Sequence, residues 1–108
     1  MTQRLPTQLV VGALVRRVND AGGIAMIRAK GDPHSGGILL LVDDRSGPVR
    51  VLERTIGLDG TANLTDSVPL DGAEAYWQRR RSRDPDLWVV DLDGAEAQRF
   101  AAETILAD

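Results

Sequence analysis

The stretch from residue 31 to residue 37 has the composition of a ligand-binding loop. It reads Gly-Asp-Pro-His-Ser-Gly-Gly, and His34 is the only histidine of the chain. A glycine-rich turn can present backbone N–H groups to an anion, and a histidine titrates near neutral pH. The stretch matches neither Gly-x-Gly-x-x-Gly nor the P-loop, because it lacks Gly-Lys-Ser/Thr and a following helix. A tight connection between two strands explains the same residue types, and Asp32 and His34 remain candidate binding residues.

A basic run marks the end of a predicted helix. Four arginines occur from position 79 to position 83, and Tyr76 and Trp77 precede them by one glutamine. Arginines beside aromatic rings are typical of surfaces that bind RNA or phosphate. Basic residues in the last turn of a helix also complement its dipole, and the two acids that follow reduce any positive potential. Both interpretations stay open. The candidate binding residues of this run are Arg79, Arg80 and Arg83.

The Asp84-Pro85-Asp86 corner carries two carboxylates, and Asp91 and Asp93 follow downstream. Clustered carboxylates can hold Mg²⁺ or Ca²⁺, but the spacing is not that of an EF-hand. Asp-Pro is also an ordinary way to stop a helix. Asp84 and Asp86 are therefore candidate binding residues, and no metal site is assigned to them.

The sequence offers little material for catalysis. It has no cysteine and one histidine, which removes thiolate nucleophiles and every Cys-based zinc site. No Gly-x-Ser-x-Gly elbow holds a serine nucleophile, and nothing selects a pair of carboxylates for acid–base work. We therefore predict no catalytic residue and no cofactor, and the sequence does not support an enzymatic activity.

The composition narrows the class of protein to which this chain can belong. The chain has 108 residues, 43% of them apolar, which suits a single domain spanning residues 1–108 with one hydrophobic core. Its 13 basic and 16 acidic residues give a net charge of −3, which disfavours nucleic-acid binding. The N-terminus lacks a signal-peptide pattern, and the longest apolar run, Ile38–Val42, is too short to cross a bilayer. These features predict a cytoplasmic protein that does not act at a membrane.

Periodicity predicts an α+β fold. Apolar residues recur at helical spacing from Pro6 to Ala21, and Gly22-Gly23 ends that helix. Strand-like and helical patterns follow, with residues 56–71 the least readable. The predicted strands are 24–30, 37–42, 48–54 and 87–92, with 62–64 as a further candidate. The later helices run over 70–83 and from 95 towards the C-terminus.

The resulting order is α-β-β-β-(loop)-α-β-α. Short turns between the first strands favour an antiparallel meander. We predict a mainly antiparallel sheet of four or five strands, with the helices packed on one face. The last strand can pair in parallel with a neighbouring strand or lie at an edge of the sheet.

A hexapeptide occurs twice. Leu-Asp-Gly-Ala-Glu-Ala stands at 70–75 and again at 92–97. A duplicated binding element is one interpretation. The other is a helix start in which Asp71 and Asp93 act as N-caps and the glutamate three residues later completes a capping box. We favour the second.

Several segments resemble one uncharacterised bacterial family, a domain-of-unknown-function family of about this length. They are Arg4-Leu5-Pro6-Thr7, residues 14–23, Lys30-Gly31-Asp32, Leu52-Glu53-Arg54 and, most specifically, Asp84-Pro85-Asp86-Leu87-Trp88-Val89-Val90. The resemblance covers nearly the whole chain. It implies a free-standing bacterial domain and carries no activity, cofactor or catalytic residue.

These observations favour a non-enzymatic protein-interaction module with a protein partner. Two alternatives remain: a small anion- or nucleotide-binding protein that joins Asp32 and His34 to the arginine run, and an RNA-binding protein that uses the Arg79–Arg83 helix end. The first requires these residues to converge around a pocket. An exposed edge strand would also permit a homodimer.

Overall fold

The computed structural model describes residues 4–106. Three helices and five strands follow the predicted order, and the candidate strand at 62–64 is present and extends to residue 67. Their bounds are α1 Thr7–Asp20, β1 Ile24–Ala29, β2 Ile38–Asp43, β3 Arg50–Ile56, β4 Ala62–Ser67, α2 Ala73–Arg83, β5 Trp88–Asp93 and α3 Ala97–Leu106. The α+β class and the order of elements are confirmed.

The five strands form one sheet in the order β1-β5-β2-β3-β4. Strands β2, β3 and β4 are an antiparallel meander, as short turns predict. The last strand, β5, inserts between β1 and β2, antiparallel to β1 and parallel to β2. The sheet is therefore mixed but mainly antiparallel, and β1 is an edge strand that does not pair with β2.

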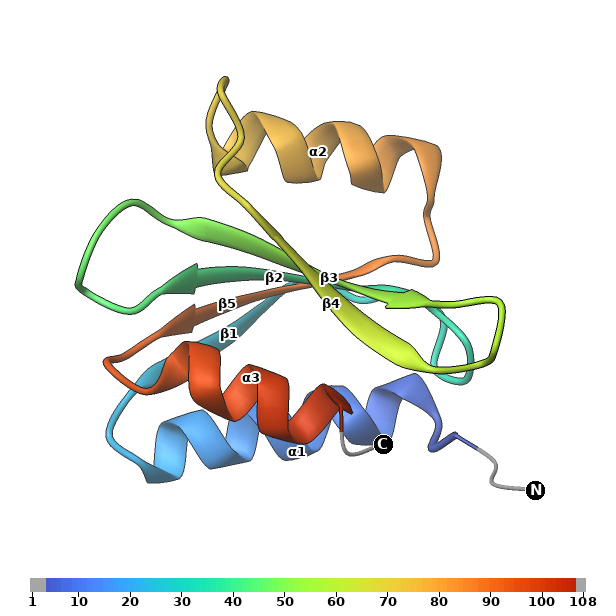
Figure 1. The fold of residues 1–108 in the computed structure, drawn as a ribbon, viewed down its shortest axis with the longest axis horizontal. Coiled ribbons are helices and arrows are strands. Elements are labelled where there is room, and N and C mark those ends of the chain that lie inside the picture. Colours follow the sequence, from blue (N-terminus) through green and yellow to red (C-terminus); the bar gives the residue numbers. More distant parts are fainter. Residues whose placement is uncertain (1–3, 107–108) are drawn as a thin grey trace.

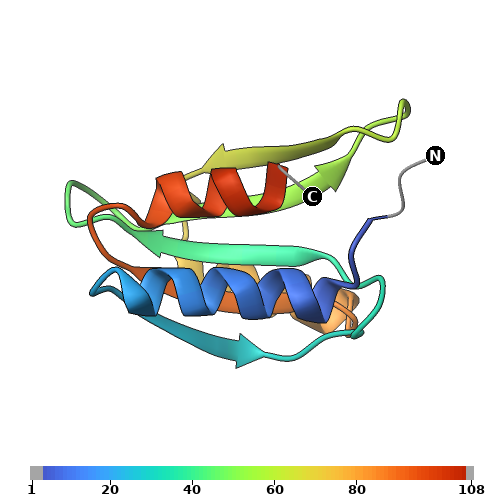
Figure 2. The same ribbon diagram turned by 90° about the horizontal axis from the view of Figure 1, so that it is seen from below.

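Helices α1 and α3 cover one face of the sheet and enclose the larger core (Figures 1 and 2). Helix α1 buries Val10, Leu14 and Val18 along one side. The core side of β2 supplies alternate residues, such as Leu40, and α3 adds Ala101 and Ile105, both fully buried. This layer is the expected packing of amphipathic helices on an aliphatic sheet.

Helix α2 covers the opposite face, which corrects the prediction that all helices pack on one face (Figure 1). The physical reason lies in β2, whose residues 38–42 are all buried. Leu39 and Leu41 point away from the larger core and require their own cover. Ala73, Tyr76 and Trp77 of α2 provide part of it, although α2 has no fully buried residue.

The two copies of the hexapeptide lie in different surroundings, and neither uses its aspartate as a cap. Gly72, at φ +91°, is the N-cap of α2, and no side chain caps that helix. Asp71 instead forms an ion pair with Arg79. Asp93 still belongs to β5, and α3 begins only at residue 97. The capping-box interpretation is therefore wrong for both copies.

No helix within residues 4–106 combines the length and the apolar character that crossing a membrane requires.

Candidate functional site

The turn that follows β1 is built around Asp32. Its carboxylate accepts hydrogen bonds from the N–H of His34 at 3.1 Å and from the N–H and hydroxyl of Ser35 at 2.8 and 3.1 Å. The bonds from Ser35, followed by the weaker one from His34, lower the pKa of Asp32 below its ordinary value. The N–H groups that an anion would need are thus already bonded to a carboxylate of the same turn.

Carbonyl groups of this turn hold the start of α1. The N–H of Thr7 donates to the carbonyl of His34 at 3.1 Å, and the N–H of Gln8 donates to that of Pro33 at 2.9 Å. The buried Thr7 hydroxyl donates to the carbonyl of Gly36 at 2.9 Å. These bonds satisfy N–H groups that a helix otherwise leaves open, so the first turn of α1 offers little to an anion.

The structure brings Asp32 close to the Asp84-Pro85-Asp86 corner through backbone contacts. The N–H of Asp32 donates to the carbonyl of Asp86 at 3.0 Å. The carboxylate of Asp84 accepts the N–H of Asp86 at 3.2 Å and closes the turn between α2 and β5. Within residues 4–106, no group of three or more His, Asp or Glu side chains is arranged to hold a metal ion.

The arginine run divides between two places: Arg81 reaches the end of β1 and donates to the carbonyl of Lys30 at 2.9 Å, whereas Arg79 and Arg80 are paired elsewhere. Arg79 forms an ion pair with Asp71, and Arg80 donates from Nε to Glu53 at 2.9 Å. Glu53 also accepts the Tyr76 hydroxyl at 2.9 Å. Burial and this bond raise the pKa of Tyr76. Arg83 is exposed at the end of α2. The structure therefore does not bring Arg79 and Arg80 together with Asp32 and His34 around one pocket.

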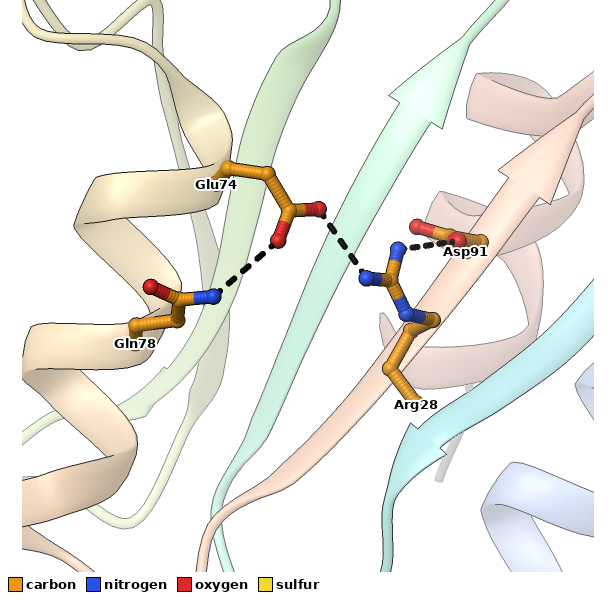
Figure 3. Close-up of polar contacts among 4 residues, drawn as sticks. All are labelled: Arg28, Glu74, Gln78 and Asp91. Atoms are coloured by element: carbon orange, nitrogen blue, oxygen red, sulfur yellow. Dashed lines mark hydrogen bonds and ion pairs between the residues drawn. The ribbon is translucent and has the colours of Figure 1, made fainter.

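A second polar cluster ties α2 to the edge of the sheet (Figure 3). Arg28 of β1 donates to Asp91 of β5 at 2.8 Å and to Glu74 of α2 at 3.0 Å. Glu74 also accepts the amide N–H of Gln78 at 3.3 Å. Arg28 stands at a bulge in β1 and lies over the half-buried ring of Trp77, 5.3 Å from its centre. Trp77 is thus a packing residue rather than a free stacking platform.

Beyond the N-terminal end of α2, the same face of the sheet is uncovered and forms a hollow of about 260 Å³. We call it the acidic-rimmed hollow. It is lined by apolar side chains of β1, β2 and the β2–β3 turn and by three carboxylates, namely Ile24, Met26, Leu41, Val49, Asp43, Asp91 and Asp93.

The strand register explains why apolar and acidic side chains alternate across neighbouring strands on this surface. Met26, Asp91 and Leu41 occupy one row across β1, β5 and β2, and the next row contains Ile24, Asp93 and Asp43. Ile24 and Met26 are 59% and 57% exposed. Large apolar side chains at this exposure on an uncovered sheet face are typical of a binding surface.

The carboxylates of the hollow outnumber their cationic partners. Asp93 pairs with Arg45 at 3.1 Å, and Asp91 pairs with Arg28, which Glu74 shares. Asp43 accepts the backbone N–H of Arg45 at 2.9 Å. Arg45 has a φ of +66°, an uncommon conformation for a residue with a side chain, and this turn places its guanidinium beside Asp93. The three carboxylates of the hollow, together with Glu74 beside it, thus share two guanidinium groups, which leaves a surplus of negative charge.

Interpretation of the sequence noted Asp91 and Asp93 as downstream carboxylates but missed the apolar residues of the hollow. The alternation of Ile24 and Met26 in a strand was visible, but their exposure depends on β1 being an edge strand. That in turn depends on the insertion of β5 on its inner side. The parallel pairing that sets Asp43 beside Asp93 is equally non-local.

Comparisons with known proteins agree on one family. The model of DUF1491, described as a protein of unknown function, matches residues 5–102. A crystal structure of a DUF1491 family protein from Caulobacter crescentus CB15 is 32% identical, with a TM-score of 0.78, and covers 90% of this chain and 94% of that one. An NMR structure of a DUF1491 family protein from the same organism is 31% identical, with a TM-score of 0.77, and covers 92% and 94% of the two chains.

A third solved structure, the solution structure of protein Atu0922 from A. tumefaciens, is 27% identical with a TM-score of 0.68 and covers 84% of this chain and 86% of that one. No curated protein matches the sequence. The resemblance to an uncharacterised family, based on motifs such as Asp84-Pro85-Asp86-Leu87-Trp88, is confirmed.

Proposed function

The chain belongs to the DUF1491 family, which brings no activity with it, and we propose that it is a protein-interaction module that binds its partner at the acidic-rimmed hollow. The observation that supports this proposal is the exposure of Ile24 and Met26 beside a concave, uncovered part of the sheet. Both side chains are already partly buried, so covering their remaining exposed surface would contribute about 1–2 kcal/mol each.

The charges of the hollow indicate the chemistry of the partner. Three aspartates line the hollow and Glu74 shares Arg28 with one of them, against the two guanidinium groups of Arg28 and Arg45. A segment that carries apolar side chains flanked by lysine or arginine would complement both features. A second copy of the chain is a poorer occupant, because a two-fold contact would place one acidic rim against another.

The two alternatives use groups that the fold already occupies. An anion at the turn after β1 would have to displace the carboxylate of Asp32 from the N–H groups of His34 and Ser35. RNA at the helix end would have to compete with Asp71 for Arg79 and with Glu53 for Arg80. The hollow needs no such displacement of backbone donors.

Site-specific photocrosslinking in the host cell tests the proposal. A benzophenone side chain replaces Met26 in one variant and Leu9 in the control, since Leu9 is an equally exposed apolar residue on the outer side of α1. We expect a discrete protein adduct at position 26 and none at position 9, with the crosslinked segment apolar and basic. Identical adducts at the two positions, or adducts with nucleic acid, would overturn the proposal.

A further inference from the structure

A second hollow, of about 370 Å³, lies on the other side of β1. We call it the α1–turn pocket. Its walls come from α1, from the end of β1 and from the turn that follows, and its apolar lining consists of Val11, Ile27, Pro33 and Trp88. Ile27 pairs with Val90 and so faces α1, whereas Met26 faces the acidic-rimmed hollow. The two hollows therefore use different side chains of the same strand.

Hydrogen bonds hold the walls of this pocket in place. The indole N–H of Trp88 donates to the carbonyl of Asp32 at 2.8 Å, which fixes the ring beneath the turn. The N–H of Gln8 donates to the carbonyl of Pro33 at 2.9 Å, which fixes the turn to α1. A pocket whose walls are fixed beforehand loses little conformational freedom when a ligand enters.

Gly12 keeps the side of the pocket formed by α1 open. It stands in the middle of the helix, where glycine weakens the helix relative to alanine. A Cβ atom built on Gly12 has no atom within 4 Å, so packing does not require the absence of a side chain. Its effect on the structure is to leave space between α1 and β1, and a larger side chain there would occupy the hollow.

Lys30, the only lysine of the chain, lines the pocket beside this apolar surface. Within residues 4–106, no ion pair involves the ammonium group of Lys30. A flexible four-carbon stem lets that charge reach a ligand seated in the pocket. The exposed amide of Gln8 stands nearby as a further polar group.

We propose that the α1–turn pocket binds a small apolar monocarboxylate, with its hydrocarbon body on Trp88, Ile27 and Val11 and its carboxylate on Lys30. The volume lies within the range of small-molecule pockets, which combine apolar walls with few polar groups. The site is independent of the acidic-rimmed hollow, where the surplus of carboxylates would repel such a ligand.

The test uses octanoate and its neutral analogue octanamide as probes, with the NMR signal of the Trp88 indole N–H as reporter. We expect saturable shifts with both probes and tighter binding of octanoate. Lys30→Gln removes one exposed charge and should weaken octanoate binding about two- to fivefold while leaving octanamide unchanged. Arg16→Gln, which removes an exposed charge elsewhere on α1, should change neither.

Gly12→Leu should abolish binding of both probes, whereas Ala13→Leu, on the exposed side of the same helix, should not. The Lys30 comparison stands even where Gly12→Leu disturbs folding, because Lys30 is exposed. Met26→Glu should leave octanoate binding intact, which separates this site from the proposed partner surface. The absence of saturable shifts, full binding by a folded Gly12→Leu variant, or equal octanoate affinity in Lys30→Gln would overturn the assignment.

Discussion

The indole N–H of Trp88 donates a 2.8 Å hydrogen bond to the backbone carbonyl of Asp32, 56 residues earlier in the chain. The contact ties the first residue of β5 to the turn that follows β1. The same turn holds the start of α1 through the carbonyls of Pro33 and His34. One tryptophan thus joins a central strand, an edge strand and a helix.

The two tryptophans of the chain should differ in how much stability a Trp→Phe substitution costs. Trp88→Phe removes the bond to Asp32 and shrinks a buried side chain, so it should lower the free energy of unfolding by about 1–3 kcal/mol. Trp77 has a buried indole N–H without a partner among the described residues. Trp77→Phe removes that unsatisfied donor and should change stability by less than about 1 kcal/mol.

Urea unfolding of both variants, monitored by circular dichroism, measures this difference. A loss in Trp77→Phe equal to that in Trp88→Phe would contradict the distinction, because it would mean that ring volume and not hydrogen bonding decides.

The carboxylate of Asp32 should titrate below its ordinary pKa of 3.8, because it accepts hydrogen bonds from Ser35 and His34. A lowered pKa in the folded state adds stability above the ordinary pKa, and this stability disappears as the pH falls through the folded value. Ser35→Ala removes the hydroxyl donor and keeps the N–H donor, so it should move the midpoint part of the way back to 3.8. Carbon-detected NMR titration of Asp32 measures both midpoints.

A matched titration of Asp59 provides the control. Its pKa is also lowered, through the N–H of Thr61, and Ser35→Ala does not touch it. A Ser35→Ala variant that shifts both aspartates equally would show a general effect on the fold and would contradict the local explanation.

The elements themselves could be predicted because their signals are local. Apolar spacing from Val10 to Val18 defines α1, and the aliphatic run from Ile38 defines β2. The identical hexapeptides at 70–75 and 92–97 show the limit of that approach. Leu70 is fully exposed in a turn, whereas Leu92 is buried in β5 between two other strands. Six residues cannot encode which strand their neighbours will pair with.

The candidate site was harder to predict than the fold for the same reason. Asp32 and His34 have the residue types of a ligand loop, and the turn uses those polar groups on itself. Glu53 lies in a predicted strand, and only the position of α2 over the sheet makes it a partner of Arg80 and Tyr76. The exposure of Met26 follows from the strand order, which depends on contacts far apart in the sequence.

Helix α2 should open locally without unfolding the sheet. It has no fully buried residue, and Glu53 anchors it by accepting bonds from Tyr76 and Arg80. Glu53→Gln removes the charge of a carboxylate that is 16% exposed and should speed amide hydrogen exchange in α2 about fivefold. Exchange in β2 and β5 should stay unchanged, because their bonds break only on global unfolding.

Glu103→Gln is the control for this experiment, since it removes an exposed ion pair with Arg17 between α1 and α3. Exchange in α2 should not respond to it. Equal acceleration of α2, β2 and β5 in the Glu53→Gln variant would show that α2 is not a separate unit of local opening.

Substitution of three glycines by alanine should show which of them lie too close to neighbouring backbone to accept a Cβ atom and which border open space. A Cβ atom at Gly36 would lie 2.2 Å from the carbonyl oxygen of Asp86, and one at Gly31 would lie 2.0 Å from the same oxygen. Both contacts are with backbone, so the turn or the Asp86 corner would have to move. Gly31→Ala and Gly36→Ala should each cost about 2 kcal/mol or more.

Gly12→Ala should act in the opposite direction. Its Cβ would contact nothing within 4 Å, and alanine in the middle of a helix stabilises it relative to glycine by about 0.5–1 kcal/mol. Urea unfolding at 25 °C measures all three variants on one scale. A stable Gly36→Ala variant would mean that the turn tolerates displacement from Asp86, and the fixed wall inferred for the α1–turn pocket would then be wrong. A destabilised Gly12→Ala variant would mean that the space beside α1 closes in solution.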